Sequence, residues 1–175
     1  DHLTNKPDLV ALSKVLTGGT LPLGVTAISS KIISAFQSDD FSKTFFHGHS
    51  YTANPIACAA ANASFELLLQ SECQQNISKI TWLHKEFINE LATNTHIKEA
   101  RSIGTILVVE LNTNEQSSYT NELRKKIYSY FLERNVLLRP LGNIFYIVAP
   151  YSINEEELKY IYKVIREFLT KRATE

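Results

Sequence analysis

An alanine-rich run from Ile56 to Leu69 is the feature that most restricts how this chain can fold. Its residues have high helix propensity and mostly small side chains, so the helix that they form suits close packing against a sheet. Pro55 precedes the run, at a position where a helix tolerates proline because the first N–H groups lack partners in any case. A second helix is expected over residues 76–92, where apolar residues recur at spacings of three and four.

Segments with strand character precede and follow these helices. Residues 9–12 predict a short buried strand, and the β-branched run 25–29 predicts a second strand. Ser30 is a candidate cap for a short helix that runs through Phe36. The chain is therefore expected to belong to the α/β class.

The C-terminal part reads as a small α+β unit. Residues 97–111 predict extended chain, in which Gly104 marks a bulge or the close approach of another backbone. An amphipathic helix is expected over 119–133, strands over 136–139 and 144–148, and a last helix after a capping-box-like pair, Asn154 and Glu157. The expected domains are residues 1–94 and residues 95–175.

Composition narrows the class of protein. The chain has 175 residues, 44% of them hydrophobic and 21% charged, as expected for a soluble globular protein with one or two small domains. Lys plus Arg equal Asp plus Glu at 18 each, which removes the broad basic surface expected of a nucleic-acid-binding protein and leaves only a local basic patch as an alternative. No apolar run approaches the ~20 residues that span a bilayer, and the first residues do not form a signal peptide. A cytoplasmic location is expected, with no membrane or nucleic-acid partner.

The cysteine and methionine content adds two expectations. Cys58 and Cys73 lack the paired spacing of metal or redox motifs, so no metal site is expected. The sequence contains no methionine and reaches a predicted strand within its first ten residues. We therefore expect a piece of a longer protein, with exposed apolar surface and a tendency to associate.

Lys14 is the first candidate for chemistry. It follows the strand at residues 9–12 and precedes Gly18 and Gly19, so its amine is presented on a rigid element beside mobile backbone. A lysine becomes a nucleophile only when burial or a neighbouring cation lowers its pKa from about 10.4. From residue 9 to residue 17 the only charge is that of Lys14, which favours such an environment. The alternative is an ordinary surface lysine after a strand.

Residues 45–54 form a second candidate site, because aromatic residues, two histidines, a glycine and hydroxyl groups lead into the helix that starts at Pro55. Hydroxyls and amides before a helix N-terminus can hold a phosphate or a carboxylate. The alternative is a hydroxyl-rich loop that only caps the helix. Arg139 is a third candidate, because it ends a predicted strand and its planar fork suits a carboxylate in bidentate geometry. A structural ion pair with a glutamate would explain Arg139 equally well.

Three segments, in the same order and with the same separation, resemble the class III pyridoxal-phosphate aminotransferases. They are residues 7–19 around Lys14, residues 46–61 around Ser50, and residues 138–151, which include Arg139. The resemblance is greatest to members that transfer an amino group from S-adenosylmethionine to 8-amino-7-oxononanoate in biotin biosynthesis. It covers the whole chain but less than half of the family's usual length. It implies the C-terminal part of a fold-type I transferase: the end of the large-domain mixed sheet, long helices, and a small α+β domain.

The resemblance also implies a role for each candidate residue. Lys14 would form a Schiff base with pyridoxal 5′-phosphate and move the substrate proton. Ser50 would bind the cofactor phosphate across the interface of a homodimer whose active site is shared. Gly48 would approach the substrate with its backbone, Arg139 would hold the substrate carboxylate, and Tyr146 would line the pocket.

The sequence also departs from the family. His49 and Ser50 stand where the best-known members carry proline and threonine, and Ala149 stands where a second proline is common. The family's aspartate at the pyridine nitrogen, its glycine-serine phosphate loop and its ring-stacking aromatic all precede this segment, so the isolated chain is expected to be inactive. The alternatives are another class III aminotransferase, of the ω-amino acid or ornithine type, and a non-catalytic α/β module.

Overall fold

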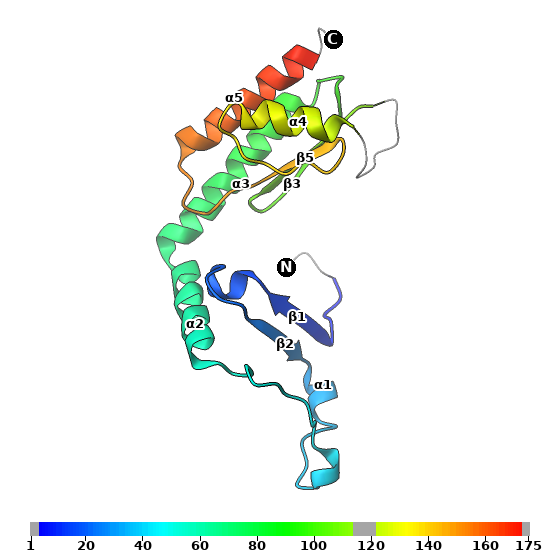
Figure 1. The fold of residues 1–175 in the computed structure, drawn as a ribbon, viewed down its shortest axis with the longest axis vertical. Coiled ribbons are helices and arrows are strands. Elements are labelled where there is room, and N and C mark those ends of the chain that lie inside the picture. Colours follow the sequence, from blue (N-terminus) through cyan, green and yellow to red (C-terminus); the bar gives the residue numbers. More distant parts are fainter. Residues whose placement is uncertain (1–3, 114–121, 173–175) are drawn as a thin grey trace. The chain divides into compact units, whose positions relative to one another are not determined.

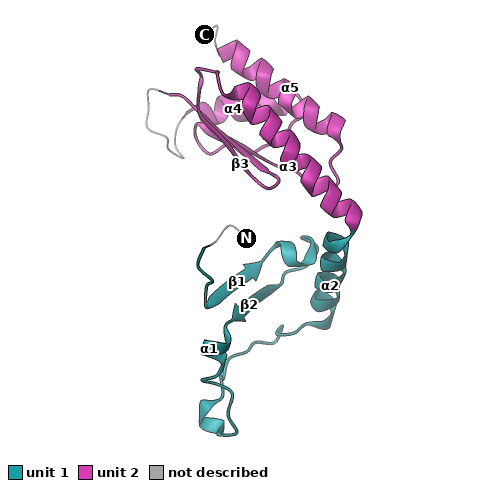
Figure 2. Cartoon of the chain, turned by 180° about the vertical axis from the view of Figure 1, so that it is seen from behind, with its two compact units in different colours: residues 1–70 teal, residues 71–175 magenta. Residues whose placement is uncertain are grey.

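The computed structural model describes residues 4–113 and 122–172, which form two compact units. Unit 1 comprises residues 1–70 and unit 2 comprises residues 71–175 (Figures 1 and 2). The division falls between Gln70 and Ser71, earlier than the domain boundary expected after residue 94. It falls there because helix α3 (Ser71–Leu91) packs on the sheet of unit 2. None of the helices among the described residues is long and apolar enough to cross a membrane.

Unit 1 is built on an antiparallel two-stranded sheet of β1 (Leu9–Ser13) and β2 (Gly24–Ile28). The register pairs Leu9 with Ile28 at one end and Ser13 with Gly24 at the other. Both strands were expected from the sequence, but the expected burial of the first strand is wrong. Leu9 is 58% exposed, because no described element covers the faces of this two-stranded sheet.

The remaining elements of unit 1 are helical. They are η1 (Val15–Thr17) and η2 (Phe41–Lys43), which are 3₁₀ helices, and α1 (Ser30–Ile33) and α2 (Pro55–Leu69). Helix α1 is shorter than expected, and Ser29 rather than Ser30 occupies its N-cap position. Helix α2 begins at Pro55 as expected and packs beside η1.

Unit 2 contains a three-stranded antiparallel sheet in the order β3 (Ile97–Ile103), β4 (Ile106–Leu111), β5 (Ile144–Val148). Its helices are α3, α4 (Leu123–Leu132) and α5 (Glu155–Arg172). Gly104 marks a tight turn, not a bulge, because Ile103 pairs directly with Ile106 across it. Its φ of 53° is a conformation that glycine adopts without steric cost.

One hydrophobic core holds unit 2 together. It joins alternate residues of β4 and β5, such as Leu107, Val109 and Phe145, to the inner faces of the three helices. The ring of Phe131 in α4 lies 5.4 Å from that of Phe145 and 5.6 Å from that of Phe168 (centroid distances). Alternation with period two along the strands therefore places one face of the sheet against the helices.

A buried polar contact lies within this core. His84 of α3 is fully buried, with Nδ1 2.6 Å from the hydroxyl of Tyr162 and Nε2 3.0 Å from the carbonyl oxygen of Thr105. A carbonyl only accepts, so Nε2–H donates to Thr105 and Nδ1 accepts from the Tyr162 hydroxyl. Burial lowers the pKa of His84 and raises the pKa of Tyr162, so both side chains are neutral at pH 7.

Three further expectations can be compared with unit 2. The last helix opens with a reciprocal capping box, in which Asn154 N donates to Glu157 and Glu157 N donates to the Asn154 side chain. The expected strand over 136–139 is absent, although Val136 and Leu138 are buried and Leu137 is exposed, as in an extended segment. Helix α4 starts at Leu123, and residues 119–121 of the expected helix lie outside the described part of the chain.

Candidate functional site

Lys14 stands at the point where β1 gives way to η1, and its backbone is strained. Its φ of 59° and ψ of −77° lie near the angles of a γ-turn with positive φ, a rare conformation for a residue with a side chain. Such conformations persist only where the surrounding structure imposes them, and they cluster at functional sites. The side chain of Lys14 is exposed, so its amine is accessible.

Thr17, which the sequence analysis did not identify, holds the turn after Lys14. It is 2% exposed, and its hydroxyl donates to the carbonyl of Leu21 and accepts from the Leu21 amide at 3.2 Å. Thr20 in turn donates its hydroxyl to the carbonyl of Thr17 at 2.7 Å. Thr17 precedes Gly18 and Gly19 in the sequence, but its burial depends on packing that no local pattern shows.

Helix α2 supports the same turn from the side. A Cβ built on Gly18 would lie 3.5 Å from Oγ of Ser64, an ordinary van der Waals contact, so the turn lies directly beside the helix. Gly18 also has a φ of 61°, which most residues avoid. Helix α2 therefore packs beside η1, next to the segment that carries Lys14, whereas the sequence predicted packing against a sheet.

The loop of residues 44–54 presents Gly48 and Ser50. The loop folds back on itself, since Thr52 Oγ1 accepts from the His49 amide at 3.0 Å and His49 Nδ1 accepts from the Tyr51 amide at 3.2 Å. The hydroxyl of Ser50 is exposed and bonds to no described residue. A free hydroxyl on a structured turn can donate to an anion such as a phosphate.

The expected anion-binding amides at the start of α2 are already occupied. Asn54 Oδ1 accepts from the amides of Ile56 at 3.1 Å and Ala57 at 3.0 Å, as an N-cap residue does. These two helix-start donors are therefore paired within the chain, and their binding of a phosphate stays a prediction. Ser50, two residues beyond Gly48, remains the candidate group of this loop.

Arg139 and Tyr146 come together in unit 2. Arg139 is an exposed residue between buried Leu138 and Pro140, while Tyr146 projects from β5. Both side chains line a pocket of about 280 Å³, whose other walls are mainly apolar and include Val148 and Pro150. The structure thus brings an arginine fork and a phenol to one apolar pocket, as an acidic ligand with an aliphatic part would need.

The structure therefore groups the five candidate residues by unit. Lys14, Gly48 and Ser50 belong to unit 1, and Arg139 and Tyr146 belong to unit 2. Within the described ranges, no three His, Cys, Asp or Glu side chains gather to form a metal site. In unit 1 the accessible lysine can form a covalent anchor and the hydroxyl can hold a phosphate, and in unit 2 the arginine beside the apolar pocket can hold a carboxylate.

Comparison with known proteins identifies the class of protein. The family model described as aminotransferase class III matches residues 1–169. The chain therefore belongs to the class III aminotransferase family, whose members depend on pyridoxal 5′-phosphate. The match includes all the candidate residues and confirms the resemblance found in the sequence.

Individual relatives show which members of the family the chain is similar to. The chain is 40% identical over 164 residues to adenosylmethionine-8-amino-7-oxononanoate aminotransferase of Synechococcus elongatus. The match covers 94% of this chain and 38% of the relative. Its fold is similar to the crystal structure of that aminotransferase from Methanocaldococcus jannaschii, with a TM-score of 0.84 and 31% sequence identity. The match covers 95% of this chain and 39% of the other chain. The chain thus spans less than two fifths of the length of these relatives.

A more distant structure supports the fold alone. It is the crystal structure of an amine transaminase from an uncultivated Pseudomonas species in its PLP-bound internal aldimine form. It is 24% identical, with a TM-score of 0.81 over 94% of this chain and 38% of that one. The expected fold class, an α/β part of a fold-type I PLP-dependent transferase, is therefore confirmed.

Proposed function

We propose that the protein containing this chain transfers an amino group from S-adenosylmethionine to 8-amino-7-oxononanoate, giving 7,8-diaminononanoate in biotin biosynthesis. The observation that supports this most strongly is the 40% identity, over nearly the whole chain, to a relative with that name. The three candidate segments fall inside residues 1–169, which the family model matches, and the pocket lined by Arg139 suits an acidic substrate. We further propose that the enzyme is cytoplasmic and homodimeric.

The residues of unit 1 fit pyridoxal 5′-phosphate. Lys14 offers an accessible amine on a turn fixed by Thr17 and α2, and Ser50 offers an exposed hydroxyl. When bound, the cofactor supplies an aldehyde for amine exchange and an electron-withdrawing ring. Lys14 would hold it covalently, and Ser50 would donate its hydroxyl hydrogen to a phosphate oxygen, from one subunit to the active site of its partner.

Each remaining residue has a role toward the substrate. The freed Lys14 amine would serve as the base that takes the proton from the substrate carbon and as the acid that returns a proton. Gly48 has no side chain, so its backbone can approach the substrate closely. Arg139 binds the carboxylate, and Tyr146 forms a wall of the apolar pocket.

Absorbance of the full-length protein with added pyridoxal phosphate tests the anchor. The lysine-bound cofactor gives an absorbance band, which Lys14→Ala should abolish. Lys6→Ala is a matched control, because Lys6 is also an exposed lysine of unit 1, and it should keep the band. Survival of the band in Lys14→Ala would show that another residue anchors the cofactor and would favour a non-catalytic role for this segment.

A substrate assay distinguishes the members of the family. Wild-type enzyme with S-adenosylmethionine should convert 8-amino-7-oxononanoate, and it should turn over ω-amino acids and ornithine far more slowly. Turnover of ω-amino acids or ornithine without turnover of the oxononanoate would instead identify the other class III activity.

A further inference from the structure

Helix α4 begins with three consecutive cations, Arg124, Lys125 and Lys126, and no acidic residue lies in its first turn. The N-terminus of a helix carries partial positive charge, so cations there destabilise the helix. Helix α5 has the opposite and favourable arrangement, with Glu155, Glu156 and Glu157 in its first turn and basic residues in its last. The stability of α4 therefore does not explain its cations.

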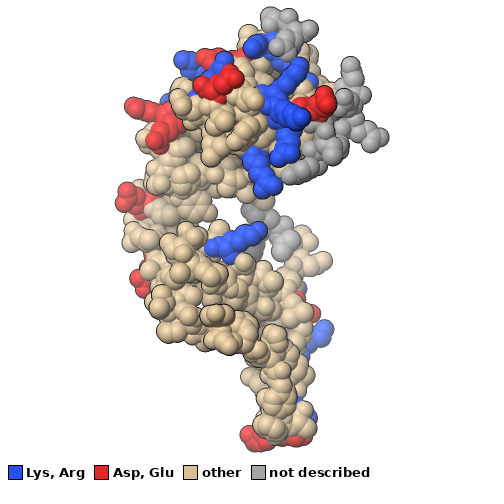
Figure 3. Space-filling model, in the orientation of Figure 1, with Lys and Arg blue, Asp and Glu red and all other residues tan. Residues whose placement is uncertain are grey.

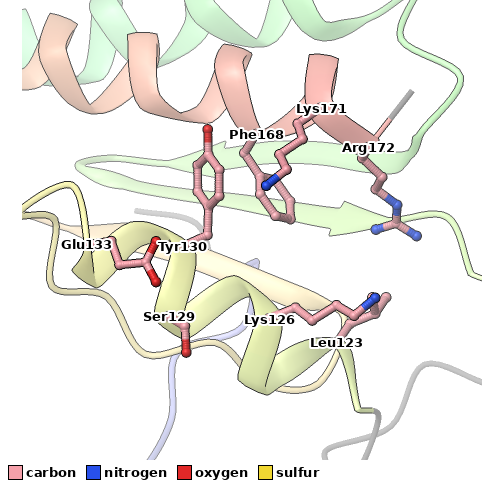
Figure 4. A pocket seen from close by; sticks show the side chains of 8 residues that line it. All are labelled: Leu123, Lys126, Ser129, Tyr130, Glu133, Phe168, Lys171 and Arg172. Atoms are coloured by element: carbon pink, nitrogen blue, oxygen red, sulfur yellow. The ribbon is translucent and has the colours of Figure 1, made fainter. Parts of the chain in front are cut away.

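The three cations of α4 line two different pockets. Arg124 and Lys125 line a pocket of about 230 Å³ together with Tyr128, Arg139 and Pro140. Lys126 instead lines a pocket of about 260 Å³ between α4 and the end of α5, where Lys171 and Arg172 lie on the opposite side (Figure 4). Figure 3 shows Lys and Arg side chains gathered over α4.

Arg139 belongs to two neighbouring pockets of unit 2. One is the apolar pocket that it shares with Tyr146, and the other is the basic pocket that it shares with Arg124 and Lys125. Pro140 is buried and has a restricted φ, so the backbone that carries Arg139 is fixed. Arg139 therefore lies where an apolar surface meets a cluster of cations. This arrangement suits an aliphatic chain that ends in a carboxylate.

We propose that Arg124 and Lys125 determine specificity by binding, together with Arg139, the terminal carboxylate of the amino-group acceptor. This assignment rests on the proposed function, because 8-amino-7-oxononanoate carries its carboxylate at the opposite end of an aliphatic chain from its amino and keto groups. Tyr128, one helical turn after Arg124, adds a hydroxyl to the same pocket. Converging cations also raise the local concentration of an anionic substrate.

Steady-state kinetics of the full-length enzyme test the assignment through Arg124→Gln and Lys125→Gln. Each variant should raise the KM for 8-amino-7-oxononanoate about fivefold to tenfold and leave kcat and the KM for the amino donor unchanged. Thermal stability should be unchanged or slightly higher, because a cation leaves a helix N-terminus. A merely structural role predicts the reverse, a loss of stability without a selective effect on KM.

Lys126→Gln is the matched control, because Lys126 belongs to the same helical turn but to the other pocket. It should leave the acceptor KM within about twofold of wild type. The methyl ester of the acceptor, which lacks the carboxylate charge, should show the same KM with wild type and with Arg124→Gln.

The outcomes separate this assignment from the proposed function. Turnover of the oxononanoate by wild type, with an unchanged KM in both variants, would overturn the assignment and leave the function standing. An equal rise in KM with Lys126→Gln or with the methyl ester would also overturn it, because the effect would then be general electrostatics or structure. Absence of turnover by wild type would overturn the function, and the assignment with it.

Discussion

Unit 1 carries Lys14, the candidate anchor, on a segment with few buried side chains, whereas unit 2 carries the hydrophobic core. Among the described residues of unit 1, only Thr17 and Ala57 are buried, and large apolar side chains such as Phe45 and Phe65 are more than half exposed. In unit 2 all three helices and two strands contribute buried side chains to one cluster. Burial of apolar surface is the main favourable contribution to folding, so the two units should differ sharply in their stability.

Separating the units should give the largest effect. Residues 71–175, expressed alone, should unfold cooperatively with a free energy of unfolding of about 5 kcal/mol or more, because the core is internal to this unit. Residues 1–70 alone should show no cooperative transition. Urea denaturation followed by circular dichroism measures both. Cooperative unfolding of residues 1–70, or its absence from 71–175, would show that burial does not account for the difference.

Single substitutions in the 175-residue chain should show the same contrast. Phe131→Ala removes a ring that is 0% exposed, and should lower the free energy of unfolding of unit 2 by about 3–5 kcal/mol. Leu12→Ala, at a residue of β1 that is 44% exposed, is the control and should cost less than about 1 kcal/mol. Chemical denaturation of both variants provides the measurement. Similar losses at the two positions would mean that β1 is covered in solution.

Between pH 7 and pH 5, stability should change with pH by less than it changes in Phe131→Ala, and the change should come from unit 2. Burial lowers the pKa of His84 below its unfolded value of about 6.5, so at lower pH the unfolded state binds a proton that the folded state does not. The contribution of neutral His84 is complete above pH 6.5 and is lost as the pH falls below it, at no more than about 1.4 kcal/mol per pH unit.

Denaturation midpoints measured between pH 7 and pH 5 test the role of His84. His84→Gln should flatten this dependence, whereas His47→Gln, at an exposed histidine of unit 1, should leave it unchanged. A dependence that persists in His84→Gln would assign the titration to another group.

Local sequence patterns predicted the helices of the chain well, and tertiary context explains where they failed. Asn154 and Glu157 cap α5 because capping depends only on neighbouring residues. Helix α3 starts at Ser71, earlier than expected. Its first residues are mostly polar and lack the apolar spacing that marks the rest, so the sequence pattern did not reveal them. The alternation from Val136 to Leu138 predicted burial correctly, but alternation does not show whether a neighbouring strand is available for pairing.

The candidate site shows the same limit. Lys14, Ser50 and Arg139 stand out in the sequence by residue type and neighbours, and their roles remain predictions. The positive φ of Lys14 and the buried hydroxyl of Thr17 depend on packing between distant segments, so no local pattern could predict them. The partition of the α4 cations between two pockets likewise depends on how Arg139 and α5 pack around the helix.

The strained backbone at Lys14 has a consequence for how variants of this protein are selected. A residue with a side chain in such a conformation costs on the order of 1–3 kcal/mol, and glycine avoids most of that cost. Replacing the lysine by glycine would thus remove the reactive amine and relax the turn at the same time. If Lys14 has its proposed role, a library ranked by soluble yield would favour sequences that lack the anchor, and only selection for the proposed activity would preserve the lysine.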